Sequence, residues 1–199
     1  MASLESLQPL HGQAVSLAEG RLREATAVGK LIIRCDISSA PVAELLVQHG
    51  LSLPTVANTY TGTEKGELFW LGPDEWLLRS NADPNSSEWS DTVNRLGKAA
   101  SDRPDVHIAL VDVSDYYTVL QLEGPHASAI LARSCPLDLR TLHPSEVKRC
   151  AQTRMGNASV MLNTHTLSPA AGEPLWNLQV RWSYADYLWK LLLRSAISF

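Results

Sequence analysis

The strongest pattern in the chain is 111-VDVSDYYTVLQLEGPH-126, which predicts a strand, a tight turn and the start of a helix. Leu120 and Leu122 fall on one face of the strand at a period of two. Gly124 can adopt the positive φ that a tight turn requires. Pro125 suits the first turn of a helix, because its missing N–H would have no partner there.

A helix and a hairpin are expected after this strand. Apolar positions within 127–131 share one helical face, and Pro136 ends the helix. Residues 150–155 and 158–163 predict two short strands, and Gly156-Asn157 between them is a dipeptide typical of hairpin turns.

The last part of the chain predicts one more strand and a helix. Apolar and polar residues alternate over 176–182, which is typical of an antiparallel strand with one buried and one polar face. Ser183 is expected to cap the final helix, with Asp186 three residues later as in a capping box.

The first half shows a similar succession of elements. We predict a strand at 30–36, a helix over 42–49 closed by Gly50, strands at 54–60, 67–71 and 75–79 with a loop at 61–66, a helix capped by Asn85 and ended by Gly97, and a strand at 106–113. Each half is therefore strand, helix, strands, helix. The sequence predicts an α+β fold in which a ferredoxin-like strand-helix-strands-helix unit with antiparallel sheets is duplicated.

The expected domain organisation follows from this repetition. Residues 1–29 are weakly patterned and predict an N-terminal arm with one loose turn. Residues 30–199 are expected to form a single domain of two similar halves, at about 30–104 and 105–199.

The composition is that of an ordinary globular protein. The chain has 199 residues, of which 45% are hydrophobic and 19% charged. A net charge of -4 argues against nucleic-acid binding, because phosphate contacts need clustered Lys and Arg. The start of the sequence has no signal-peptide pattern, and the apolar runs are too short to span a bilayer, so we expect no membrane partner. Three cysteines without a C-x-x-C motif indicate reduced thiols and a cytoplasmic protein.

The common catalytic motifs are absent from the sequence. It contains no G-x-G-x-x-G, no G-x-x-x-x-G-K-[ST] and no G-x-S-x-G. The histidines show no H-x-H or H-E-x-x-H spacing; they are His11, His49, His107, His126, His143 and His165. A metal site assembled from distant histidines remains an alternative, although zinc sites usually show local ligand spacing. We expect His49 to pack or cap its helix and His126 to be an ordinary first-turn residue.

Two carboxylates and one thiol are candidate reactive groups. Asp112 and Asp115 flank Ser114 after an apolar strand, where a carboxylate can serve as a base. The alternative is a turn residue that binds its own backbone, which we favour because no partner acid or base is identifiable nearby. Cys135 precedes Pro136 at a helix end, where no N-terminal dipole lowers its pKa, so we favour inert packing over reactivity.

The final helix, 183–194, has more apolar surface than a helix in a two-layer domain needs. Its charges form a single stripe, Asp186, Lys190 and Arg194, and the rest of its surface is apolar or aromatic. One interpretation is that it packs between its own sheet and a neighbouring helix. The other is that part of it faces another subunit, where Trp, Tyr and Arg are favoured.

Six blocks of sequence, in order, resemble the gamma-subunit family of heterotetrameric sarcosine oxidase. The blocks are 71-LGPDEWLL-78, 111-VDVSD-115, 122-LEGP-125, 135-CPLDL-139, 149-RCAQT-153 and 184-YADYLW-189. The resemblance runs from about Leu31 to the C-terminus, and the residues before Lys30 look less typical.

The resemblance implies a fold related to the folate-binding aminomethyltransferase of the glycine cleavage system. It also implies a four-subunit flavoenzyme that oxidatively demethylates sarcosine to glycine. The methyl group is passed to tetrahydrofolate or released as formaldehyde, and hydrogen peroxide is formed. In such an assembly the other subunits hold FAD, FMN, NAD, tetrahydrofolate and zinc. The gamma chain is a non-catalytic component docked on the alpha subunit, with beta and delta subunits in the same complex. We therefore expect no catalytic, cofactor-binding or metal-ligating residue in this chain.

Two other hypotheses remain open at this point. An independent folate-binding or one-carbon-transfer protein is motivated by the related fold and by Asp112 and Asp115. A flavin-bearing catalytic chain is the other, and the missing dinucleotide fingerprint argues against it.

Overall fold

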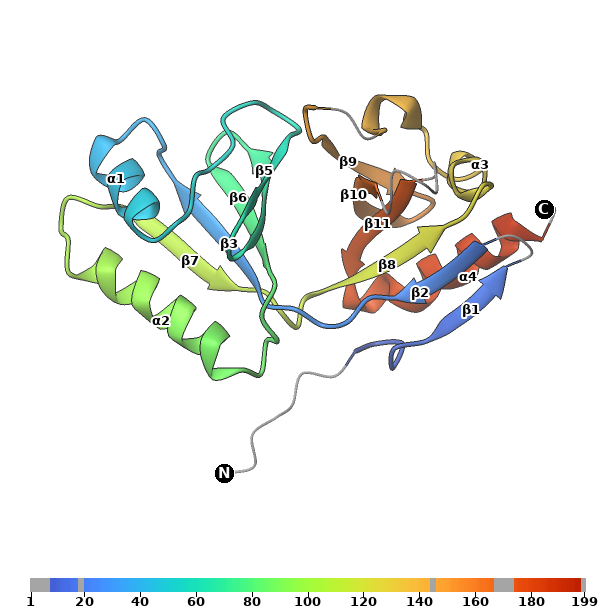
Figure 1. Ribbon diagram of the computed structural model, residues 1–199, viewed down its shortest axis with the longest axis horizontal. Coiled ribbons are helices and arrows are strands. Elements are labelled where there is room, and N and C mark those ends of the chain that lie inside the picture. Colours follow the sequence, from blue (N-terminus) through green and yellow to red (C-terminus); the bar gives the residue numbers. More distant parts are fainter. Residues whose placement is uncertain (1–7, 18–19, 144–145, 167–173, 198–199) are drawn as a thin grey trace. The chain divides into compact units, whose positions relative to one another are not determined.

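The computed structural model describes residues 8–17, 20–143, 146–166 and 174–197, and the chain separates into two compact units (Figure 1). The described part of unit 1 is 27–114, and that of unit 2 combines 8–26 with 115–197. Both units contain helices and a sheet whose neighbouring strands are antiparallel, which confirms the predicted α+β class. Among the described residues, none of the helices has the length and apolar character needed to cross a membrane.

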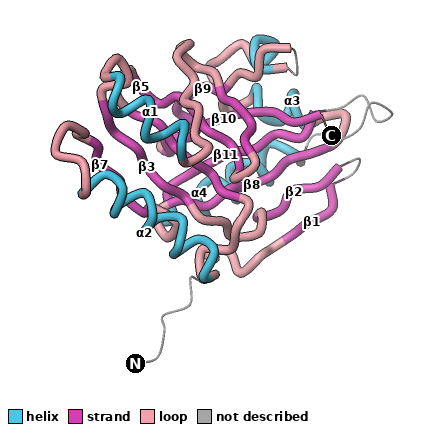
Figure 2. Tube along the Cα trace, turned by 60° about the vertical axis from the view of Figure 1, so that its left-hand side comes forward, coloured by secondary structure: helices cyan, strands magenta, loops and turns pink. Residues whose placement is uncertain are grey.

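Unit 1 is a five-stranded sheet with two helices. Its elements are β3 (Lys30–Cys35), α1 (Ala40–Gln48), β4 (Tyr60–Thr63), β5 (Gly66–Gly72), β6 (Glu75–Ser80), α2 (Ser87–Ser101) and β7 (Ile108–Asp112). The strand order in the sheet is β4-β5-β6-β3-β7. Both helices lie on one face of the sheet (Figure 2). The core between them contains Leu31, Ile33 and Trp76 from the strands, Leu45 from α1 and Trp89 from α2.

The second helix of unit 1 differs from its predicted bounds at both ends. Ser86, and not Asn85, is the N-cap: its hydroxyl accepts a hydrogen bond from the backbone N–H of Trp89 at 3.2 Å. The helix also continues through Gly97 to Ser101. A glycine ends a helix when it adopts a left-handed conformation just past the last turn, as Gly50 does after α1 with φ of 75°. Gly97 instead stays within the helix and only weakens it.

The predicted strand at 54–60 is mostly loop. Only Tyr60 of that range lies in β4, and the expected loop at 61–66 supplies the rest of the strand and a tight turn into β5. Pro54 has a different role, because its carbonyl oxygen accepts a hydrogen bond from the Trp76 indole N–H at 2.8 Å. The segment therefore provides a hydrogen-bond acceptor for the buried Trp76 side chain instead of extending the sheet.

Unit 2 is a six-stranded sheet with two helices on one face (Figures 1 and 2). Its elements are β1 (Ala14–Leu17), β2 (Gly20–Glu24), β8 (Tyr117–Glu123), α3 (Ala127–Ala132), β9 (Cys150–Met155), β10 (Ala158–Thr166), β11 (Pro174–Arg181) and α4 (Ala185–Ala196), with short 3-10 helices at Leu139–Leu142 and Trp182–Tyr184. The strand order is β1-β2-β8-β11-β10-β9. Gly124 and Gly156 have φ of 118° and 56°, as their turns require.

Part of the arm expected at 1–29 belongs instead to the sheet of unit 2. Residues 14–17 and 20–24 form β1 and β2, and β2 pairs with β8 so that Leu22 lies opposite Leu122. Leu22 is fully buried in the core of unit 2. The expected boundary near residue 104 also differs, since unit 1 extends to Ser114 because β7 pairs with β3.

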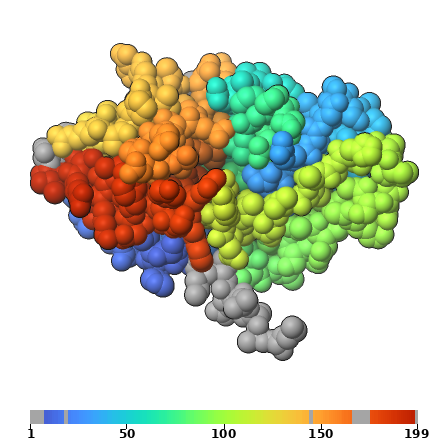
Figure 3. Space-filling view, turned by 180° about the vertical axis from the view of Figure 1, so that it is seen from behind, coloured from blue at the N-terminus to red at the C-terminus, as the bar shows by residue number. Residues whose placement is uncertain are grey.

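Strand β11 and helix α4 each depart from the prediction in one respect. The supposedly polar face of β11 is buried, because Asn177 and Gln179 are 2% and 4% exposed. Ser183 does not cap α4; it lies in a short 3-10 helix, and Tyr184 takes the N-cap position without a side-chain hydrogen bond. Figure 3 shows one side of α4, in red, on the surface of unit 2.

Candidate functional site

The first candidate base, Asp112, is a structural residue at the end of β7. One carboxylate oxygen, Oδ1, accepts hydrogen bonds from the Ser114 backbone N–H at 2.9 Å and from its hydroxyl at 2.6 Å. The other, Oδ2, accepts one from the Trp89 indole N–H at 2.7 Å. Asp112 therefore forms the predicted turn and also anchors a buried tryptophan of α2. Asp115 belongs to unit 2.

The thiols are placed for packing. Cys35 and Cys135 are each 7% exposed and belong to the cores of units 1 and 2. Burial, together with the nearby carboxylates of Asp36 and Asp74, raises the pKa of the Cys35 thiol to about 11. At neutral pH Cys35 is a thiol, which is a poor nucleophile.

The histidines do not form a common cluster. Among the described residues, no group of three His, Cys, Asp or Glu side chains is arranged to hold a metal ion. His49 Nδ1 lies 2.9 Å from the carbonyl oxygen of Leu45, one turn earlier in α1. His126 occupies the N-cap position of α3, as a residue of the first turn.

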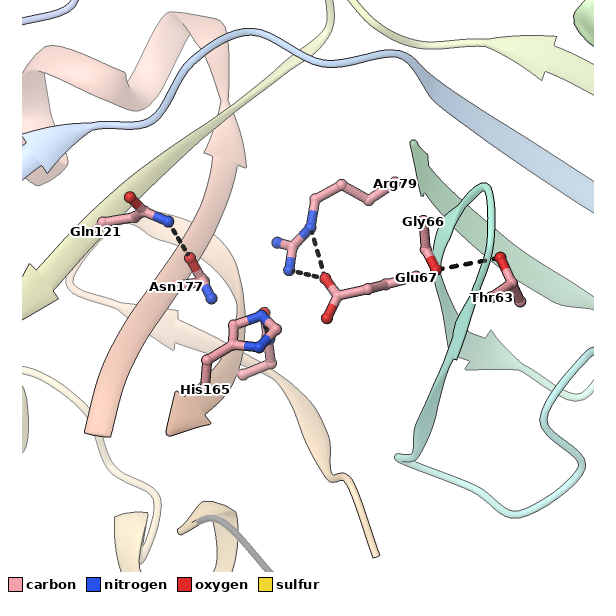
Figure 4. A network of polar contacts seen from close by, with 8 residues as sticks. Thr63, Gly66, Glu67, Arg79, Gln121, His165 and Asn177 are labelled. Atoms are coloured by element: carbon pink, nitrogen blue, oxygen red, sulfur yellow. Dashed lines mark hydrogen bonds and ion pairs between the residues drawn. The ribbon is translucent and has the colours of Figure 1, made fainter. Parts of the chain in front are cut away.

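The helix-free face of the unit 1 sheet carries an aromatic stack and an ion pair, and Figure 4 shows the ion pair. The Arg79 guanidinium lies 2.6 Å from the Glu67 carboxylate, and these side chains are only 9% and 18% exposed. Arg79 also lies over the ring of Phe69, with 4.6 Å to the ring centroid, and Tyr60 stacks on Phe69 at 4.9 Å. These contacts hold β4, β5 and β6 together and keep the carboxylate engaged with a cation.

The helix-free face of the unit 2 sheet carries a row of amides. Gln121, Asn177 and Asn163 lie side by side on β8, β11 and β10, and the Gln121 amide N–H donates to Asn177 Oδ1 at 2.8 Å (Figure 4). Two buried amide atoms, Asn177 Nδ2 and Gln179 Oε1, make no hydrogen bond within the described part of the chain. Carboxamides donate and accept hydrogen bonds but do not titrate, so this row offers no acid or base.

The final helix packs mainly on its own unit. Leu188, Trp189 and Leu192 are buried in the unit 2 core, and Trp189 is 7% exposed. The charged stripe faces solvent, where the Lys190 ammonium lies 2.7 Å from the Asp186 carboxylate. The helix could either pack within its own unit or face another subunit. Trp189 follows the first interpretation, because it is buried in the unit 2 core.

One open depression lies on unit 1, along the first half of α2. Its volume is about 520 Å³, and its lining residues are Ser87, Glu88, Asp91, Asn94 and Arg95. All of these described lining residues come from one helix, so they form a single wall of an open depression.

The sequence indicated only part of an aromatic surface at one end of unit 2, namely the aromatic residues of the final helix. The surface is formed by Tyr116, Tyr117, Arg181, Trp182, Tyr184 and Tyr187, and is called here the tyrosine surface. Arg181 in β11 lies opposite Tyr117 in β8, and the Trp182 backbone N–H donates to the Tyr116 carbonyl oxygen at 3.0 Å. The pairing of β8 with β11 brings Tyr116 and Tyr117 beside Arg181 and Trp182. Tyr184 and Tyr187 follow Trp182 in the chain, at the start of α4.

Comparison with known proteins gives a consistent result. The model of the sarcosine oxidase, gamma subunit family matches residues 34–198. The sarcosine oxidase subunit gamma of Corynebacterium sp. (strain U-96) is 31% identical over 189 residues, which cover 94% of this chain and 81% of that protein. The subunit gamma of Corynebacterium sp. (strain P-1) is 28% identical over 186 residues, covering 90% and 84%.

A solved structure extends the likeness to three dimensions. A chain of the heterotetrameric sarcosine oxidase from Corynebacterium sp. U-96, in complex with pyrrole 2-carboxylate, matches with a TM-score of 0.72 and 30% identity. The match covers 93% of this chain and 87% of that chain. On the sequence match and the shared fold together, the chain belongs to the sarcosine oxidase gamma subunit family.

Proposed function

We propose that this chain is the non-catalytic gamma subunit of a heterotetrameric sarcosine oxidase, which oxidatively demethylates sarcosine to glycine. The observation that carries the proposal is the likeness to a chain of the heterotetrameric enzyme, over 93% of this chain with a TM-score of 0.72. A match over 93% of the chain must extend over both units, so each unit has a counterpart in that assembly.

The local chemistry supports a role without catalysis. Both oxygens of Asp112 are engaged by Ser114 and Trp89, and Cys35 is held as a thiol. We propose that FAD, FMN, NAD, tetrahydrofolate and zinc are held by other subunits and that the chain docks on the alpha subunit, with beta and delta in the same complex. A cytoplasmic location suits the three buried cysteines, because thiols stay reduced there.

The two units support the further proposal of an internal duplication. From its first strand, unit 1 has the order β3, α1, β4, β5, β6, α2, and unit 2 has β8, α3, β9, β10, β11, α4. The sheets also match, because β4-β5-β6-β3-β7 corresponds to β9-β10-β11-β8-β2 position by position. A simple ferredoxin-like unit has four strands, whereas the sheet has five strands in unit 1 and six in unit 2. We relate the repeat to the aminomethyltransferase fold on the basis of the family resemblance.

The test is co-expression of the chain with the alpha, beta and delta subunits, with an affinity tag on alpha. We expect the chain to elute with the tagged complex in equal molar amount. A chain that elutes alone as a stable monomer, while the other subunits assemble, would contradict the proposal.

A second measurement separates this proposal from the alternatives. The purified chain alone is expected to show no flavin absorbance in the visible range and no heat on titration with tetrahydrofolate. A yellow chain would support a flavin-bearing subunit. Micromolar tetrahydrofolate binding would support the folate-binding alternative. Of the two carboxylates that favour that alternative, Asp112 and Asp115, Asp112 already accepts hydrogen bonds from Ser114 and Trp89.

A further inference from the structure

The tyrosine surface concentrates the residue types that dominate protein interfaces. It contains four of the five tyrosines of the chain, together with Trp182 and Arg181. Tyr116, Tyr184 and Tyr187 are 44%, 38% and 36% exposed, so each ring keeps a substantial part of its area accessible to a partner. Tyr, Trp and Arg are the residues enriched at the energetic centres of interfaces.

The rings are already held in place, which lowers the entropy that binding must overcome. Tyr116 and Tyr117 pack edge to face with their centroids 4.7 Å apart, and Tyr184 and Tyr187 do so at 6.4 Å. The Tyr187 hydroxyl accepts a hydrogen bond from the Asn157 backbone N–H at 3.1 Å, which fixes the ring over the β9–β10 turn.

Arg181 gives this surface an uncompensated positive charge. Its guanidinium carbon lies 5.1 Å from the centroid of the Tyr116 ring, and the residue is exposed. No carboxylate in the part of the chain that the structure describes forms an ion pair with it, whereas other arginines such as Arg34, Arg103 and Arg140 each have one. A guanidinium that lies over a ring and forms no ion pair among the described residues can bind a carboxylate through two hydrogen bonds.

We propose that the tyrosine surface is the face by which this chain docks on the alpha subunit of the oxidase, and that the alpha subunit supplies an Asp or Glu side chain to Arg181. The inference rests on the proposed function and adds the site of contact and the chemistry of the partner. In the complex the tyrosine rings surround the ion pair and exclude water from it, which strengthens the pairing.

The experiment measures binding of the purified chain to the alpha–beta–delta complex. The test variants are Arg181→Glu and Tyr116→Ser. The matched controls are Arg154→Glu, an exposed arginine of β9 in the same unit, and Val56→Ser, an exposed apolar residue of unit 1. Circular dichroism and thermal unfolding verify that each variant keeps the fold.

We expect each test variant to raise the dissociation constant by about tenfold or more, and each control to leave it within about twofold. The wild-type affinity should fall as salt rises, and Arg181→Gln should flatten that dependence because it removes the charge. Folded test variants that bind like wild type would overturn the docking site and leave the proposed function standing. Control variants that weaken binding as much as the test variants do would also overturn the docking site. The same holds if the test variants disrupt only self-association of the chain. Wild-type chain that fails to bind at all would instead overturn the proposed function, and the docking site with it.

Discussion

Glu24 shows how one buried carboxylate fixes the N-terminal segment to unit 2. The residue is 5% exposed and lies in β2. Its oxygens accept hydrogen bonds from the Thr118 hydroxyl at 2.8 Å and from the backbone N–H groups of Gly12 at 2.9 Å and Leu10 at 3.2 Å. One side chain thus joins the turn before β1, strand β2 and strand β8.

Replacing Glu24 is therefore expected to cost stability. Glu24→Ala leaves the Thr118 hydroxyl and two backbone N–H groups without their acceptor, and we expect the free energy of unfolding to fall by about 2–3 kcal/mol. Urea denaturation followed by tryptophan fluorescence measures the change. Glu64→Ala, at an exposed turn of unit 1, is the control and should change the free energy by less than about 0.5 kcal/mol. Equal stability of both variants would show that the three hydrogen bonds contribute little.

A second prediction at this scale concerns Cys35 and pH. Because burial raises the pKa of its thiol from 9.0 to about 11, the folded state holds this proton more tightly than the unfolded state. The unfolded chain then loses the proton first, so the free energy of unfolding should fall as the pH rises from about 9 to about 11. Cys35→Ala removes this contribution. Denaturant unfolding at several pH values should give a shallower decline for the variant than for wild type, and parallel curves would contradict the assignment.

At the scale of elements, helix α4 allows the contribution of a buried side chain to stability to be compared with that of an exposed ion pair, because the two occur at adjacent residues. Trp189 is 7% exposed and packs in the unit 2 core, whereas Lys190 forms an ion pair with Asp186 in which both side chains are more than half exposed. Apolar burial stabilises folded proteins far more than an exposed ion pair does.

The two substitutions should therefore differ strongly in effect. Trp189→Ala is expected to lower the free energy of unfolding by about 3–5 kcal/mol, through lost burial and the cavity left behind. Lys190→Ala should change it by only about 0.2–0.5 kcal/mol. Thermal unfolding of the two variants side by side makes the comparison. A small loss for Trp189→Ala would mean that the helix is held by contacts other than its buried face.

At the scale of the whole molecule, each compact unit has its own core, and unit 2 is built from two separate segments of chain. Residues 8–26 and 115–197 contribute to the same sheet, while unit 1 occupies 27–114 between them. Strand β2 covers one edge of β8, and Leu22 is fully buried in the resulting core.

Removal of the N-terminal segment should damage unit 2 and spare unit 1. A chain that begins at Ala27 lacks β1, β2 and Leu22, which leaves β8 as an unpaired edge and opens the core. We expect amide hydrogen exchange to lose protection in β8, β10 and β11 and to keep it in β3, β5 and β6. The point variant Leu22→Ala should retain both units and lose about 2–5 kcal/mol. Full protection of unit 2 in the shortened chain would show that the segment is an accessory arm after all.

Most individual elements of this protein could be predicted from local sequence. Strands β3, β5, β6, β8, β9 and β11 and the helices follow from the period of apolar residues, and the turns at Gly124 and Gly156 follow from glycine's access to positive φ. These signals depend only on residues close together in the chain. The six sequence blocks that indicate the family are local in the same sense. The α2 cap was misassigned by one residue because Asn85 and Ser86 are both good caps, and only the hydrogen bond to Trp89 distinguishes them.

The rest depended on which distant segments meet. Strand β2 is a short polar-apolar stretch with a weak sequence pattern. It forms a strand because its backbone pairs with the edge of β8. The amides of β11 look solvent-facing from their alternation, yet Asn177 and Gln179 are buried. Arg181 and Tyr116 lie far apart in the chain and share one surface because β8 and β11 pair. Periodicity specifies the conformation of a segment, whereas burial and neighbourhood come from contacts that only the folded chain makes.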